Sequence, residues 1–113
     1  MSNARWGGGG REGMAQLARM FPTLAGADGA EPWAPEALMR WSVSGAATSG
    51  GAHAVAFLLN VWNSRTDWRA VAAELGIEGS GERFAFNVGE AIGCWDRQHR
   101  EAFLAWCRDP FHP

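Results

Sequence analysis

The sequence predicts an all-α fold, an irregular bundle of five or six short helices around a central helix near residues 49–62. Residues 52–62 are the most continuously apolar stretch of the chain. Within them Phe57, Leu58 and Val61 recur at helical spacing, which indicates a core helix. Only residues 84–86 could be extended, and three residues are too few to found a sheet.

The helices before residue 49 are predicted by apolar spacing and by proline. Met14, Leu17 and Phe21 lie three or four residues apart and indicate a helix over residues 14–21, which Pro22 ends. Residues 23–32 are rich in glycine and alanine and are typical of a loop. Pro35 suits the first turn of a second helix, which we expect to reach about residue 43.

The helices after residue 63 are predicted by residues that cap helix N-termini. Asp67 begins a helix over residues 68–75, and Asn87 with Glu90 resembles a capping box for a short helix over residues 88–95. We take Ser49 as the cap of the central helix. Asp96 begins the last helix, which ends at residues 109–110.

The last helix offers two adjacent stripes that could face the core. One consists of Phe103, Leu104 and Cys107, and the other of His99, Phe103 and Trp106. We expect both Phe103 and Trp62 to lie in the core. If they do, Phe103→Ala and Trp62→Ala should each cost about 3–5 kcal/mol of stability.

At 113 residues the chain has room for one domain. Residues 7–10 are four glycines without a preceding strand, so residues 1–13 are predicted to be a flexible N-terminal arm and residues 14–113 a single helical domain. Two cysteines are too few for a disulfide framework, and no apolar run approaches the roughly 20 residues that span a bilayer. We therefore expect a cytoplasmic protein without a membrane segment.

The charged residues are twelve acids and ten arginines, with no lysine, which gives a net charge of −2. A nucleic-acid binder needs a basic field that displaces counterions from phosphates. This composition does not favour nucleic acid as the partner. A small regulator that contacts nucleic acid despite its charge remains an alternative.

Metal and nucleophilic chemistry have weak candidates in the C-terminal part. Two thiolates and two imidazoles can complete a zinc shell, although their spacing matches no common zinc motif; they are Cys94, His99, Cys107 and His112. Cys94, His99 and Asp96 could also act as nucleophile, base and orienting group. Buried thiols and scattered histidines explain the same residues, so we predict no metal, no cofactor and no catalytic residue, and keep a zinc or thiol protein as an alternative.

Seven tryptophans are the least ordinary feature of the composition. A core of this size uses two or three, so we expect some to be partly exposed. Tryptophan and arginine are enriched at binding hot spots, and here they adjoin one another. The alternative is that arginine stems only cover the edges of buried rings. The predicted partner-binding residues are Trp33, Arg40, Trp41, Trp68, Arg69, Trp95 and Arg97.

Two segments resemble small uncharacterised proteins encoded on plasmids and integrative elements of GC-rich proteobacteria. They are HAVAFLLNVWN at residues 53–63 and EAIGCWD at residues 90–96, the latter followed by HREAFLAW at residues 99–106. The resemblance implies a small product of a mobile genetic element that binds and blocks a host protein, as anti-CRISPR inhibitors do. We expect a non-enzymatic binding protein whose partner is another protein or protein complex, in the form of an inhibitor of a host defence complex.

Overall fold

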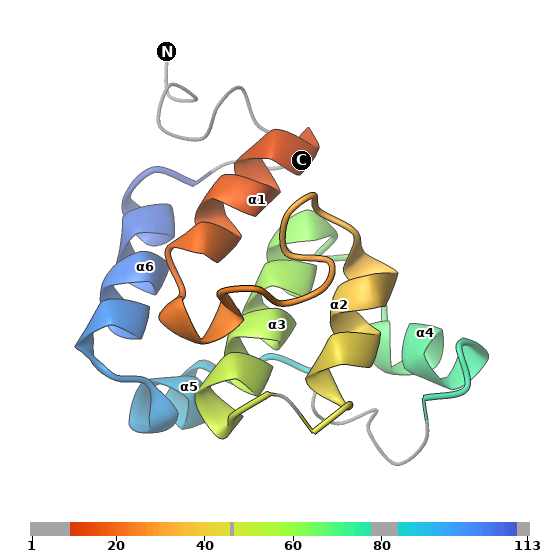
Figure 1. Cartoon of the computed structure of the whole chain (residues 1–113). Helices are drawn as coiled ribbons and strands as arrows, with labels where there is room; N and C mark the ends of the chain where they lie inside the picture. The colour runs from red at the N-terminus through yellow and green to blue at the C-terminus, as the bar shows by residue number, and fades with distance from the viewer. Residues whose placement is uncertain (1–9, 46, 78–83, 111–113) are drawn as a thin grey trace.

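The computed structural model describes residues 10–45, 47–77 and 84–110, and these residues form helices and turns without any strand (Figure 1). The all-α class and the number of helices are confirmed. The elements are α1 (Gly10–Arg19), the 3-10 helix η2 (Pro22–Leu24), α2 (Pro35–Ser42), α3 (Ser49–Trp62), α4 (Trp68–Glu74), α5 (Val88–Cys94) and α6 (Arg97–Arg108).

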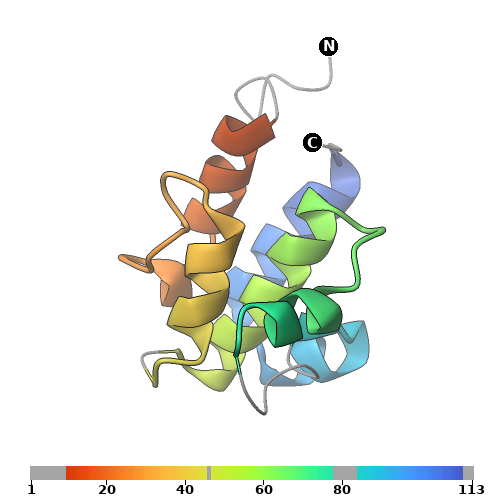
Figure 2. The same ribbon diagram turned by 90° about the vertical axis from the view of Figure 1, so that its right-hand side faces the viewer.

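Helix α3 is the central element, with the bounds that the sequence predicts. It packs against α1, η2, α2 and α5. In Figure 2 α1 and α2 lie on one side of α3 and α6 on the other. Its N-cap is Thr48 rather than Ser49, because the Thr48 hydroxyl accepts the hydrogen bond from the Gly51 amide, at 3.1 Å.

The other three predicted caps are confirmed by their hydrogen bonds. Asp67 accepts from the amide of Arg69 at 3.1 Å, and Asn87 accepts from the amide of Glu90 at 3.0 Å. Asp96 accepts from an amide of α6 at 3.0 Å. Each bond satisfies a donor that the first helical turn leaves without an intrahelical partner.

Helix α1 begins at Gly10, four residues before the predicted start, so residues 10–13 belong to the helix and not to an arm. The predicted arm over residues 1–9 lies outside the described residues. Between α1 and α2 the chain turns through Gly29, whose φ is +90°. A Cβ at this position would collide with the backbone of Ala34 and Leu38, so glycine permits the loop to lie directly on the start of α2.

The core is centred on Phe57 of α3, which lies at the middle of an aromatic cluster. Its ring lies 5.1–6.3 Å, centroid to centroid, from the rings of five neighbours, and most of these pairs are edge-on or tilted. The neighbours are Phe21, Phe86, Trp95, Phe103 and Trp106. Residues 84–86 form no strand, and Phe86 packs against the core instead.

Only one of the two stripes predicted for α6 faces the core. Its buried residues are His99, Ala102 and Ala105. Leu104 is 41% exposed and Cys107 is exposed, so the stripe that contains them points away from the core. The two side chains whose truncation tests the core assignment, those of residues 62 and 103, are half-buried against the core rather than enclosed by it.

Candidate functional site

Three of the four tryptophans predicted to contact a partner are buried. Trp33, Trp68 and Trp95 are 2%, 8% and 2% exposed, so in this structure these three rings offer almost no surface to a partner. The indole N–H of Trp68 donates to the carbonyl of Asn63 at 3.1 Å, and that of Trp95 donates to the carbonyl of Gly50 at 3.0 Å. Indoles that find backbone acceptors inside the fold can be buried completely.

The ring of Trp33 packs on Trp62, with centroids 5.8 Å apart. Arg11 closes this pair, because its guanidinium lies 5.4 Å from the centre of the Trp62 ring and donates to the carbonyl of Trp33 at 2.8 Å. At this pair the structure matches the second interpretation of the tryptophans and arginines, in which an arginine covers packed rings and does not form a binding face with them. Trp6 lies outside the described residues.

The remaining predicted contact residues do not form one face. Trp41 is half-buried on α2, and Arg40 donates to the carbonyl of Leu75 at 3.4 Å, which ties α2 to the end of α4. Arg69 is exposed at the start of α4 and pairs with its helix cap at 3.4 Å. Arg97 is exposed at the start of α6, which lies across α3 from α4 (Figure 1).

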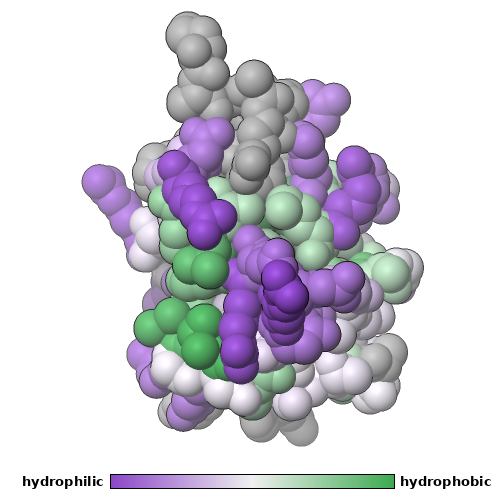
Figure 3. Space-filling view, turned by 90° about the vertical axis from the view of Figure 1, so that its left-hand side faces the viewer, coloured by the Kyte–Doolittle hydropathy of each residue, from purple (hydrophilic) through white to green (hydrophobic). Residues whose placement is uncertain are grey.

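A different surface combines exposed apolar and basic side chains. We call it the outer face of α6, and Figure 3 shows the side of the molecule on which it lies, where purple side chains cross the surface beside green atoms. Spacings of three and four residues place its members on one side of the helix. They are Arg97, Arg100, Glu101, Leu104, Cys107 and Arg108, all exposed.

Charge also distinguishes this face from the rest of the chain. Between Arg97 and Arg108 the helix carries three arginines and one glutamate, whereas the whole chain carries more acids than bases. Arg97 pairs with Glu101 at 3.1 Å. Arg100 uses its Nε to donate to the carbonyl of Ile92 at 3.3 Å, which holds its stem across the end of α5.

Sequence reasoning assigned Leu104 and Cys107 to the core, although the sequence contains a signal against that assignment. Arg97, Arg100 and Arg108 share a helical side with Leu104, and charged side chains are rarely buried. The opposite side carries the small residues that let α6 approach the core closely. A count of charges on each side would have oriented the helix correctly.

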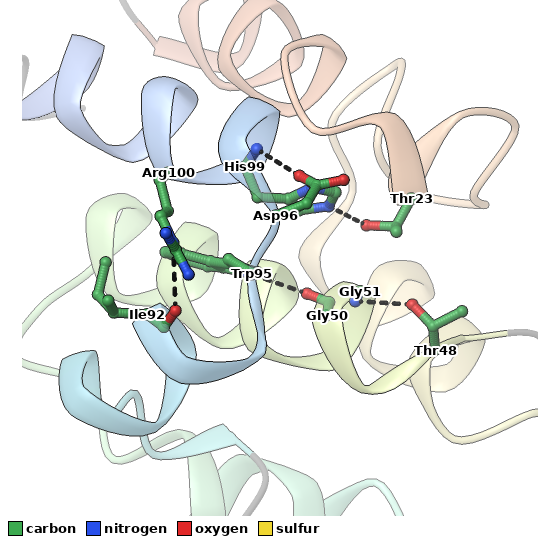
Figure 4. Close-up of polar contacts among 9 residues, drawn as sticks. All are labelled: Thr23, Thr48, Gly50, Gly51, Ile92, Trp95, Asp96, His99 and Arg100. Carbon is green, nitrogen blue, oxygen red and sulfur yellow. Dashed lines mark hydrogen bonds and ion pairs between the residues drawn. The ribbon is translucent and has the colours of Figure 1, made fainter.

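A second arrangement, between η2 and the start of α6, joins Thr23, the buried His99 and the exposed Asp96 (Figure 4). His99 Nε2 lies 2.6 Å from Thr23 Oγ1, and His99 Nδ1 lies 2.8 Å from Asp96 Oδ1. The imidazole is 3% exposed, and the rings of Phe21 and Trp95 lie 5.5 and 6.3 Å from it. Hydrogen bonds from the backbone amide of His99 first, and from its ring second, hold the pKa of Asp96 below its ordinary value.

This arrangement contains two of the three groups considered from the sequence, the base and the orienting group. The pair of Asp96 and His99 exists, but the hydroxyl of Thr23 and not the thiol of Cys94 occupies the other side of the imidazole. Cys94 is exposed near the end of α5. Thr23 precedes His99 by 76 residues, so no local pattern could have identified it.

The predicted zinc candidates do not meet as a group within the described part of the chain, where no three histidine, cysteine or acidic side chains converge. Both ring nitrogens of His99 face other partners, and His112 lies outside the described residues. Partial burial raises the pKa of the Cys107 thiol, which disfavours the thiolate that metals bind.

An open cavity of about 640 Å³ lies between α1, the loop after η2 and the start of α2. Arg19 closes one side through two bonds to the Glu31 carboxylate, at 2.9 and 2.6 Å, and this contact lowers the pKa of Glu31. Most of the lining residues have small apolar side chains and no reactive group. They include Ala15, Ala18, Ala27, Ala30, Ala34 and Ala37.

Among the helices of residues 10–45, 47–77 and 84–110, none combines the length and the apolar character needed to cross a membrane. No family model matches the chain, and no curated protein and no solved structure matches it either.

Proposed function

We propose that the protein acts without catalysis, by binding another protein through the outer face of α6. The observation that carries the proposal is Leu104, a large apolar side chain 41% exposed between Arg100 and Arg108. The same helix uses its opposite side to pack on the core, so the fold does not account for this leucine. An apolar anchor surrounded by arginines is typical of a binding hot spot.

The chemistry of the face favours an acidic partner surface with a central apolar pocket. Guanidinium groups bind carboxylates through two parallel hydrogen bonds, and this geometry adds specificity as well as energy. Arg97 reaches such a partner at small cost, because its present ion pair with Glu101 is exposed and screened by solvent. Arg100 contacts Ile92 only through Nε, so its terminal nitrogens can turn toward a partner.

Two features of the chain support a more specific proposal about the kind of partner and the compartment. The resemblance of residues 53–63 and 90–106 to mobile-element proteins supports inhibition of a host defence complex, including one of CRISPR type. Both cysteines are free thiols, as in a reducing compartment, and this supports binding in the cytoplasm.

The test compares proteins retained from a bacterial lysate by three immobilised proteins. They are the wild type, a double variant Arg100→Glu with Leu104→Ser, and the control Arg65→Glu, which reverses an exposed charge at the turn between α3 and α4. We expect acidic proteins to be retained by the wild type and the control, and lost by the folded double variant.

Equal retention by all three proteins would show that the outer face of α6 does not bind. Retention of nucleic acid in place of protein, with a steep loss between low and physiological salt, would support the nucleic-acid regulator instead. Expression of the wild type and the double variant in a strain with an active defence system tests the narrower proposal. If the defence system is equally active in cells that express the wild type and in cells that express the double variant, inhibition through this face is contradicted.

A further inference from the structure

We propose that Thr23 is an acylation site, whose hydroxyl attacks a small activated acyl donor, such as an acyl phosphate or an aryl ester, with His99 as base and Asp96 as orienting group. The reaction is one covalent transfer to the protein. It uses a site separate from the outer face of α6 and goes beyond the binding function proposed above.

The hydrogen bonds set the protonation that a nucleophile needs. The Asp96 carboxylate is ionised at neutral pH and can only accept, so the proton of the neutral imidazole belongs on Nδ1, which donates to Oδ1 over 2.8 Å. The lone pair of Nε2 then faces Thr23 Oγ1 at 2.6 Å. A hydroxyl, a base and a third group that fixes the base are the pattern of an activated nucleophile.

Burial and capping hold the base in this geometry. Asp96 is the N-cap of α6 and accepts the His99 amide at 3.0 Å, so the same carboxylate fixes both the backbone and the ring. Phe21 and Trp95 pack near the imidazole and leave it 3% exposed.

The first turn of α3 lies next to the Thr23 hydroxyl (Figure 4). A Cβ built on Gly51 would stand 3.5 Å from both Cβ and Oγ1 of Thr23, so only the bare backbone of this glycine lies against the hydroxyl. The Gly51 amide already donates to the Thr48 hydroxyl at 3.1 Å, so what the first turn of α3 offers at this point is the positive end of the helix dipole. This 14-residue helix can therefore stabilise the negative charge that develops on the donor's carbonyl oxygen.

The proposed step balances without a further reactant. The proton of Thr23 Oγ1 passes to His99 Nε2 as the Oγ1–carbon bond forms and the carbonyl electron pair moves to oxygen. When this pair returns, the bond from carbon to the leaving group breaks, and the leaving group takes the proton from Nε2. The products are a threonine ester and the protonated leaving group.

The ester should persist instead of turning over. Hydrolysis needs a water molecule placed between the acyl carbon and Nε2, and after the transfer the ester oxygen of residue 23 already occupies the position 2.6 Å from Nε2. Thr23 itself is half-buried, which restricts the transferred acyl group to a small one. The protein is thus modified stoichiometrically, in agreement with a function that does not involve catalysis.

The test treats the full-length protein with p-nitrophenyl acetate and locates the acetyl group by peptide mass spectrometry. Cys94→Ser and Cys107→Ser serve as the background, because both thiols are exposed and react with this ester. The chain contains no lysine, so the N-terminal amine is its only aliphatic amine, and the background of acetylation is low. We expect a single acetyl group on Thr23, retained in Thr23→Ser and absent from Thr23→Val.

Activation by the imidazole is tested separately with His99→Gln, which we expect to slow acetylation of Thr23 by about 100-fold. Circular dichroism establishes that each variant is folded. If His99→Gln unfolds, acetylation of Thr23→Ser and its absence from Thr23→Val still test whether the hydroxyl of residue 23 is the nucleophile. Folded wild-type protein without acetyl on Thr23 would overturn the proposal. An equal rate in folded His99→Gln would overturn it as well, since the hydroxyl would then need no base.

Discussion

The two faces of α6 differ in chemistry although they share one helix. The inner face carries His99, Ala102 and Ala105, which are buried, and the small size of the two alanines lets the helix lie close to the aromatic cluster. The outer face carries three arginines and Leu104, and all of these side chains are exposed. The comparison indicates that the inner face determines stability, whereas the outer face is available for a partner.

The largest expected effect comes from the core that the inner face covers. Phe57→Ala removes the ring at the centre of the aromatic cluster and should destabilise the protein by about 3–5 kcal/mol, because five neighbouring rings lose a packing partner. Urea unfolding followed by circular dichroism measures this loss. A change below about 1 kcal/mol would mean that the cluster does not hold α6 to α3.

A smaller loss is expected at Trp95, the residue that joins the start of α6 to the start of α3. Trp95→Phe keeps an aromatic ring but leaves the Gly50 carbonyl without its donor, so we expect a cost of about 1–3 kcal/mol. Trp41→Phe is the matched control, because Trp41 is half-buried, and it should cost less. Equal unfolding free energies for the two variants would contradict the importance of this bond.

The third expected effect is a pH dependence of the stability that Asp96, the N-cap of α6, contributes. The pKa of Asp96 in the folded protein is below its ordinary value of 3.8, so its contribution to stability is complete above that value and is lost as the pH falls through the lower, folded pKa. Asp96→Asn keeps a capping oxygen and removes the titration. Melting temperatures measured above and below pH 3.8 should therefore converge for wild type and variant on acidification. A constant difference would exclude this linkage.

The smallest effect on stability is expected on the outer face. Leu104→Ser should change the unfolding free energy by no more than about 0.5 kcal/mol, since the side chain is exposed. Ala102→Ser is a matched control on the inner face, where a buried hydroxyl should cost more. A larger loss for Leu104→Ser than for Ala102→Ser would mean that the two faces have been assigned the wrong way round.

Local signals predicted the elements, and long-range contacts determined the site. The bounds of α3 and the caps Asp67, Asn87 and Asp96 follow from residues within one turn of each other, which is why the sequence alone located them. The bond between Thr23 and His99 depends on how η2 docks on α6, and no spacing in the sequence encodes that docking.

The tryptophans show the same limit of sequence reasoning. Composition indicated that seven rings exceed what a core of this size uses, but three of the four predicted contact rings are buried, and Trp33 is buried without an acceptor for its indole N–H. Trp68 and Trp95 find backbone carbonyls at the ends of α3, which no residue count could predict. The partner surface therefore has to be sought where large apolar side chains remain exposed, at Met20, Val88 and Leu104, and of these Leu104 lies among arginines.

The most direct test of the account is the amount of acidic protein retained from lysate by the folded Arg100→Glu and Leu104→Ser double variant, relative to the charge-matched Arg65→Glu. If the outer face of α6 binds the partner, this ratio should fall to about one tenth or less, which corresponds to a loss of at least 1.4 kcal/mol in binding. A ratio near one, with both proteins folded, would contradict the account.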